Sequence, residues 1–129
     1  MRTIKFRGKR LDNGEWLYGD YHHRAGGVHC IIVMAPNKQG KVVYIVHQVA
    51  PDTIGQSTGL FDKNGKEIYE GDVVTFDNNL QGISKVMFAE GCYMVVAKNY
   101  ATSLTFRLAN HTFVAGNIHD NPELLKQND

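Results

Sequence analysis

The segment TGLFDKNGKEIYEGDVVTF, residues 58–76, decides between two descriptions of this chain. Oxygen-bearing side chains such as Asp62 and Asn64 resemble the ligands of a calcium loop, whereas the glycines are typical of turns between short strands. An EF-hand loop starting at Asp62 needs a glycine at position 6 and an acid at position 12, where this chain has Glu67 and Val73. The segment therefore predicts turns and strands, and we expect no metal site.

Three residue pairs predict the tight turns of the fold. They are Asn13-Gly14, Asn64-Gly65 and Gly71-Asp72. Asn and Gly both tolerate the positive φ of a type I′ turn, so each Asn-Gly pair predicts a hairpin. Gly71-Asp72 predicts a sharp bend in which the carboxylate accepts backbone N–H bonds. Residues 13–21 repeat the order of residues 64–73, from Asn-Gly to Gly-Asp, and predict the same turn at Gly19-Asp20.

Short runs rich in Val and Ile predict a mainly β protein with small antiparallel sheets. Beyond the strands flanking Asn13-Gly14, these runs are residues 28–34, 41–49, 71–77, 83–91, 92–98, 103–109 and 111–119. Pro51 and two glycines interrupt the pattern, which divides the chain into an N-terminal β-hairpin region, 1–50, and a second region, 51–129, within one compact unit. Asn121, Pro122 and Glu123 predict one short C-terminal helix.

Composition excludes several classes of function. The 14 Lys and Arg residues balance 13 Asp and Glu residues, so no overall charge attracts nucleic acid or an anionic membrane. The N-terminus is too polar for a signal peptide, and no apolar run approaches the roughly 20 residues of a membrane span. We therefore expect a cytoplasmic protein. Cys30 and Cys92 both lie in apolar runs and are expected to be buried free thiols.

The N-terminal stretch MRTIKFRGKR is the strongest local concentration of positive charge. Strand alternation places Lys5, Arg7 and Lys9 on one side and Ile4 and Phe6 on the other. Together with Arg10, these cations are candidate contacts for a phosphate backbone. The alternative is an ordinary solvated strand whose charges prevent self-association.

No other motif indicates chemistry. The cluster HHRAGGVHC, residues 22–30, is rich in zinc-ligand types, but a second ligand pair is missing, and His29 and Cys30 point to opposite faces of a strand. The chain contains neither a nucleophile elbow nor a phosphate-binding loop. We therefore expect no catalytic residues, no cofactor and no metal.

Three blocks of sequence resemble the signature blocks of the YopX-type phage and prophage protein family. They are IKFRGKRLDNGEWLYGD (4–20), PDTIGQSTGLFDKNGKEIYEGDVV (51–74) and GNIHDNPELL (116–125). The resemblance implies an association with bacteriophages or prophages and an SH3-like β-barrel in the C-terminal part. It assigns no catalytic residue.

These observations predict a non-enzymatic phage or prophage accessory protein that acts as a binding or assembly module. Its partner is another copy of the chain or an unidentified host or phage protein. We expect a homo-oligomer, with the apolar runs 28–34 and 41–49 as the interface. Two alternatives stay open: a nucleic-acid-binding accessory protein that uses the basic N-terminal strand, and an unrecognised enzyme.

Overall fold

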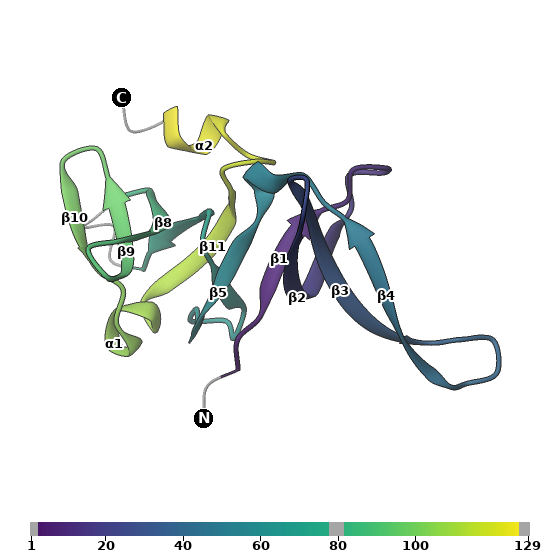
Figure 1. Cartoon of the computed structure of the whole chain (residues 1–129). Helices are drawn as coiled ribbons and strands as arrows, with labels where there is room; N and C mark the ends of the chain where they lie inside the picture. The colour runs from purple at the N-terminus through teal and green to yellow at the C-terminus, as the bar shows by residue number, and fades with distance from the viewer. Residues whose placement is uncertain (1–2, 78–81, 127–129) are drawn as a thin grey trace. The chain divides into compact units, whose positions relative to one another are not determined.

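Antiparallel β-strands dominate the computed structural model of this chain (Figure 1). The structure describes residues 3–77 and 82–126. The helical segments within these ranges are the short 3₁₀ helix η1 (Pro51–Thr53) and two four-residue α-helices, α1 (Phe106–Ala109) and α2 (Glu123–Lys126). The mainly β class predicted from the sequence is therefore confirmed. The chain divides into two units, residues 1–56 and 57–129, and each is described by itself.

The first unit is an antiparallel sheet built from consecutive strands. Its strands are β1 (Phe6–Lys9), β2 (Trp16–Arg24), β3 (Val28–Pro36) and β4 (Val42–Gln48), and they lie in the order β4-β3-β2-β1. The other side of β1 pairs with the first two residues of β5 (Gly55–Phe61), so β1 is an interior strand and β4 is an edge strand. Ile31 and Val49 are buried and contact Gly8, where they leave little room for a larger side chain.

The outer half of the β3–β4 hairpin has no other strand beside it. β2 pairs with β3 over residues 28–32, whereas the β3–β4 pairing continues from residue 33 to the turn. We call residues 33–45 the arm; it is the two-stranded ribbon that continues beyond β2 in Figure 1. Asn37 forms its turn, since its side-chain oxygen accepts bonds from the N–H groups of Gln39 and Lys41.

The second unit contains a five-stranded antiparallel sheet. In spatial order its strands are β10 (Tyr100–Ser103), β9 (Cys92–Ala97), β8 (Ser84–Ala89), β7 (Asp72–Phe76) and β11 (Thr112–Asn117). The later part of β5 pairs with β6 (Glu67–Tyr69). The buried core consists of Ile68, Val74, Phe76, Val86, Val95, Leu104 and Ala109. In the described residues the sheet is open, because β10 and β11 are not paired, so its hydrogen bonds do not close the expected barrel.

Alternation along residues 71–119 predicts a common core of Val74, Phe76, Val86 and Phe88, but Phe88 does not join it. Val74, Phe76 and Val86 are buried together, but Phe88 is 53% exposed and packs edge-on against Tyr93. β7 pairs with β8 at residues 84 and 85, whereas residues 86–89 pair with β9 across the hairpin. Alternation predicts the face of the sheet to which a side chain points. The length of the neighbouring strand then determines whether that side chain is covered.

Two further segments differ from the sequence predictions. Residues 103–109 were expected to be one strand, but β10 ends at Ser103 and α1 follows, with the Thr105 hydroxyl accepting a bond from the Leu108 N–H at 3.1 Å. Gly19 lies inside β2 and not at the predicted turn. A Cβ at this position would lie 2.2 Å from the backbone oxygen of Ile32. Glycine is needed at this position for close approach of two strands.

Candidate functional site

The basic residues of β1 do not form a row on the surface. Arg7 is only 6% exposed, and its guanidinium carbon lies 4.7 Å from the ring centre of Trp16. Arg10 forms a 2.6 Å ion pair with Asp12 and lowers the pKa of that carboxyl through their hydrogen bond. The predicted exposure of Arg7 is wrong because the Trp16 ring of β2 lies against its guanidinium, which alternation within β1 cannot reveal.

The remaining members of the predicted basic stripe occupy intermediate positions. Lys5 and Lys9 are half-buried, and the Lys9 ammonium lies 5.5 Å from the Trp16 ring centre. Ile4, which was expected on the buried side, is 54% exposed. Arg7 is buried between Lys5 and Lys9, and Arg10 beyond Lys9 is ion-paired, so the four cations do not form a continuous exposed stripe. A contact with nucleic acid stays a prediction.

The segment that resembled a calcium loop is a turn centred on a buried carboxylate. Asp62 is 5% exposed, and one of its oxygens accepts bonds from the N–H groups of Asn64 and Lys66. The other oxygen accepts from the Val114 N–H at 2.9 Å, which ties the turn to β11. Gly65 has a φ of 83° and donates to the Asp62 carbonyl. The Asp62 oxygens therefore bind backbone N–H groups.

The other predicted turns have related geometry. Asp72 is buried and accepts a bond from the Tyr69 N–H at 2.8 Å, and Gly71 beside it has a φ of 88°. At the first hairpin, Gly14 has a φ of 73°, but Asn13 is not in the left-handed region, so the connection is not the expected type I′ turn. The Asn13 side chain instead accepts from the Glu15 N–H.

The histidine cluster forms a stack in the first unit. The rings of His23 and His29 are parallel, with centres 4.2 Å apart, and Nδ1 of His29 bonds the Tyr21 hydroxyl at 2.7 Å. Cys30, next to His29, is a buried free thiol, while Cys92 is free and half-buried. No group of three or more metal-ligand side chains occurs among residues 3–77 and 82–126.

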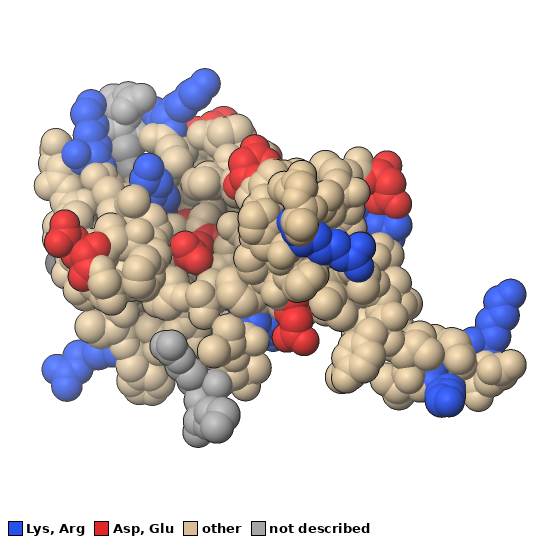
Figure 2. Space-filling view, viewed as in Figure 1, with Lys and Arg blue, Asp and Glu red and all other residues tan. Residues whose placement is uncertain are grey.

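The arm carries a concentration of exposed apolar side chains. Met34, Val42 and Tyr44 are 66%, 63% and 71% exposed. Strand register places Met34 beside Tyr44, and both line a hollow of about 500 Å³ at the base of the arm together with Tyr18. Figure 2 shows the arm as a surface without acidic residues in this view and with basic residues only toward its end. This face has the character of a protein contact surface.

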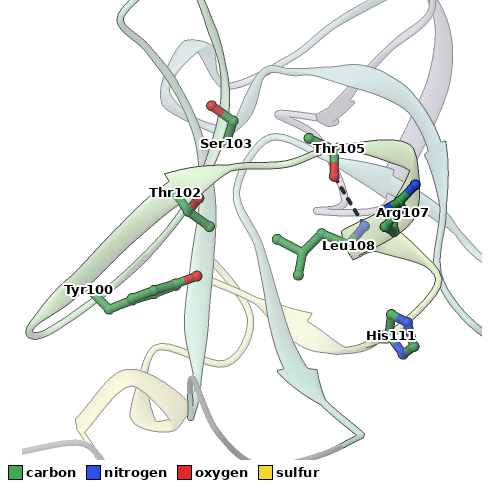
Figure 3. Close-up of a pocket in the computed structure, with 7 residues that line it drawn as sticks. All are labelled: Tyr100, Thr102, Ser103, Thr105, Arg107, Leu108 and His111. Atoms are coloured by element: carbon green, nitrogen blue, oxygen red, sulfur yellow. Dashed lines mark hydrogen bonds between the residues drawn. The ribbon is translucent and has the colours of Figure 1, made fainter.

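A second hollow, of about 400 Å³, lies in the second unit between β10 and α1. Four hydroxyl-bearing residues line it: Tyr100, Thr102, Ser103 and Thr105. Arg107, Leu108 and His111 complete the lining, and Figure 3 shows Tyr100 and Leu108 directed toward one another. This site was not predicted from the sequence, because residues 103–109 were expected to form a strand. Thr105 before a run of good helix formers was the available signal.

One ion-pair cluster adjoins this hollow. A single oxygen of Asp77 accepts bonds from Nδ1 of His111 and from the Lys63 ammonium, both at 3.1 Å. The hydrogen bond from His111, followed by that from Lys63, lowers the pKa of the Asp77 carboxyl. His111 is thereby oriented, and its Nε2 atom is left for other partners.

The fold and its surfaces define a small, mainly β protein of two units whose exposed features are an apolar arm and a polar hollow. The chain matches the family described as YopX protein over residues 5–126, and it belongs to that family. The crystal structure of protein EF1440 from Enterococcus faecalis is similar, with a TM-score of 0.60 and 23% identity over 97% of this chain and 99% of that chain. At this identity the similarity shows the fold alone. No curated protein matches the chain.

The described part of the chain has no helix that is both long enough and apolar enough to span a bilayer.

Proposed function

We propose that this protein is a non-enzymatic assembly module that self-associates through the outer edge of β4, in the phage or prophage setting that its family resemblance implies. The observation that carries the proposal is the sequence of this edge strand, VVYIVHQ, which contains no Lys, Arg, Asp or Glu. Soluble proteins usually protect an exposed edge with a charge, a proline or a bulge, and β4 has none of these.

The neighbouring strand has the protection that β4 lacks. Beyond residue 32, the side of β3 that faced β2 also becomes an edge, but Pro36 lies there and has no N–H to offer a new strand. Lys38 and Lys41 are in the turn at the end of the arm and leave the middle of β4 without charge. The contrast favours β4 as the edge that receives a partner.

A second copy of this chain fits the edge of β4. An antiparallel pair of identical strands is self-complementary, as a two-fold interface requires, and no like charges would face one another in a β4–β4 pair. Side chains on both sides of β4 would be covered, because Tyr44 and Ile45 point to opposite faces and both are exposed. Each apolar cross-strand pair contributes on the order of 0.2–1 kcal/mol.

The isolated arm also supports the proposal energetically. A two-stranded ribbon is only marginally stable in water, and sheets become independently stable with three or more strands and a covered apolar face. Pairing of two β4 strands would place the arm in a four-stranded ribbon. It would also cover part of the apolar surface formed by Met34, Tyr44 and Tyr18.

Light scattering coupled to size exclusion tests the proposal from low to several hundred micromolar protein. We expect the mass of two or more chains for the natural sequence and the mass of one chain for Tyr44→Lys. Phe106→Lys is the matched control, since Phe106 is 73% exposed, close to the 71% of Tyr44, and lies in the second unit. This variant should keep the mass of the natural protein.

Circular dichroism establishes that each variant is folded before its mass is interpreted. The mass of one chain for the natural sequence throughout the range would overturn self-association. An oligomer that persists in folded Tyr44→Lys and in folded Ile45→Lys would show that the contact lies elsewhere, and it would overturn the assignment to β4.

A further inference from the structure

The hollow between β10 and α1 brings unused polar groups together in the second unit. The Arg107 guanidinium and the hydroxyls of Tyr100 and Thr102 have no hydrogen-bond or ion-pair partner among the described residues. The lining residues include no carboxylate. Asp77, which bonds the lining residue His111, also accepts a bond from Lys63. The hollow therefore favours a negatively charged ligand.

The hollow also has an apolar part. Figure 3 shows the hydroxyl end of Tyr100 directed toward Leu108, and both side chains supply apolar surface to the hollow. Its volume of about 400 Å³ is within the range of about 300–1,000 Å³ that is usual for small-molecule sites. A ligand that fills it must combine an anionic group with a flat, weakly polar part.

His111 adds a requirement for a hydroxyl or phosphate group. Its Nδ1 bonds the Asp77 carboxylate, so Nε2 accepts a bond from a ligand hydroxyl when the ring is neutral and donates to an anion when the ring is charged. Thr102 supplies a hydroxyl that can bond either a sugar or the polar edge of a base.

We propose that this hollow binds a nucleoside monophosphate, with the phosphate on Arg107, the base against Tyr100 and Leu108, and the sugar hydroxyls near His111. The inference goes beyond self-association through β4 and is independent of it, because every residue of the hollow belongs to residues 57–129. Arginine suits a phosphate because its planar guanidinium can donate two bonds at once.

Titration followed by NMR amide shifts of the full chain tests the proposal with adenosine 5′-monophosphate, adenosine and inorganic phosphate as probes. We expect the monophosphate to bind at least tenfold more tightly than adenosine. Arg107→Gln should remove most of that difference, because a hydrogen bond to a charged group is lost. Tyr100→Ala should weaken the monophosphate and adenosine alike and leave inorganic phosphate unchanged.

Arg24→Gln is the matched control, since Arg24 is also an exposed arginine but lies in the first unit and does not line the hollow. It should bind the monophosphate as the natural protein does. The proposal would be overturned if Arg107→Gln bound the monophosphate as tightly as the natural protein, or if the amide shifts mapped outside the hollow. It would also be overturned if the monophosphate did not bind at ligand concentrations on the order of 10 mM. An octathymidylate without a terminal phosphate that binds more tightly than the monophosphate would overturn the small-molecule assignment in favour of a nucleic-acid strand.

Discussion

Replacement of Asp62 by alanine measures how much the turn at residues 62–66 contributes to stability. The substitution removes both carboxylate oxygens and leaves three N–H groups without their acceptor, those of Asn64, Lys66 and Val114. The first two belong to exposed residues, and water can replace the lost acceptor there. The Val114 N–H lies in a half-buried part of β11, where water is a poorer substitute.

These three losses set the expected magnitude. An N–H group left unsatisfied in a buried setting costs about 1–3 kcal/mol, and an exposed intramolecular bond contributes about 0.5–1.5 kcal/mol. We therefore expect Asp62→Ala to lower the free energy of unfolding by about 3 kcal/mol. Asp62→Asn should lower it less, because one carbonyl oxygen remains and can serve either the turn or Val114 but not both.

Urea unfolding followed by circular dichroism gives the free energy, and hydrogen exchange at Val114 gives a local reading of the same bond. Lys66→Ala is the control, since it removes an exposed side chain but keeps the backbone N–H that bonds Asp62; its effect should stay within about 0.5 kcal/mol. Trp16 fluorescence is a poor probe for this variant, because the single tryptophan lies in the first unit.

Two results would refute this reasoning. The first is an Asp62→Ala protein as stable as Lys66→Ala, which would mean that the three bonds contribute nothing. The second is a rise in melting temperature with added calcium that Asp62→Ala abolishes, because a ligand at a hundred times its dissociation constant stabilises by about 2.7 kcal/mol. That rise would restore the calcium interpretation of the segment.

Two other predictions concern charge and packing. The pKa of the Asp77 carboxyl should lie below the ordinary value of about 3.9, so its stabilising bonds are present above that pH and are lost as the pH falls through the lowered pKa. His111→Ala should raise the pKa of Asp77 in an NMR titration, because the hydrogen bond from His111 is lost. An unchanged pKa would contradict this cause. Gly19→Ala should cost about 3 kcal/mol or more in urea unfolding, since its Cβ would lie 2.2 Å from the Ile32 oxygen. Gly14→Ala, with open space but a φ of 73°, should cost about 1–2 kcal/mol, and equal losses would refute the close-approach argument.

The sequence predicted those parts of the fold that depend on local signals. The strands β3 and β4 followed from the apolar runs 28–34 and 41–49, and the turn at Asn64-Gly65 followed from residues that tolerate positive φ. Gly19 shows the limit of this reasoning. Gly71-Asp72 lies at a bend, whereas the same dipeptide at Gly19-Asp20 lies inside β2. The difference depends on the close approach of Ile32, which belongs to another strand and is not visible in the local sequence.

The candidate sites were harder to predict than the strands. The hollow near α1 depends on Tyr100, Arg107 and His111, which lie on three different elements or loops and form no sequence motif. The apolar arm was partly predictable, since the runs 28–34 and 41–49 were the expected interface. The sequence did not show where β2 stops pairing with β3, and this endpoint determines which residues of the hairpin are exposed.

The distribution of charge between β1 and β4 is the opposite of what edge protection would produce in a monomer. β1 carries Arg7 and Lys9, yet it has neighbours on both sides and needs no protection. β4 pairs with β3 alone except at its last residue, where the Gln48 oxygen accepts a bond from the Leu11 N–H, and it carries no charge. If the unit acted alone, a lysine within β4 would hinder unwanted pairing without disturbing any core contact, since Tyr44 and Val46 are already exposed. The uncharged edge therefore supports the proposal that another strand covers it, and the simplest source of that strand is the same segment of a second copy.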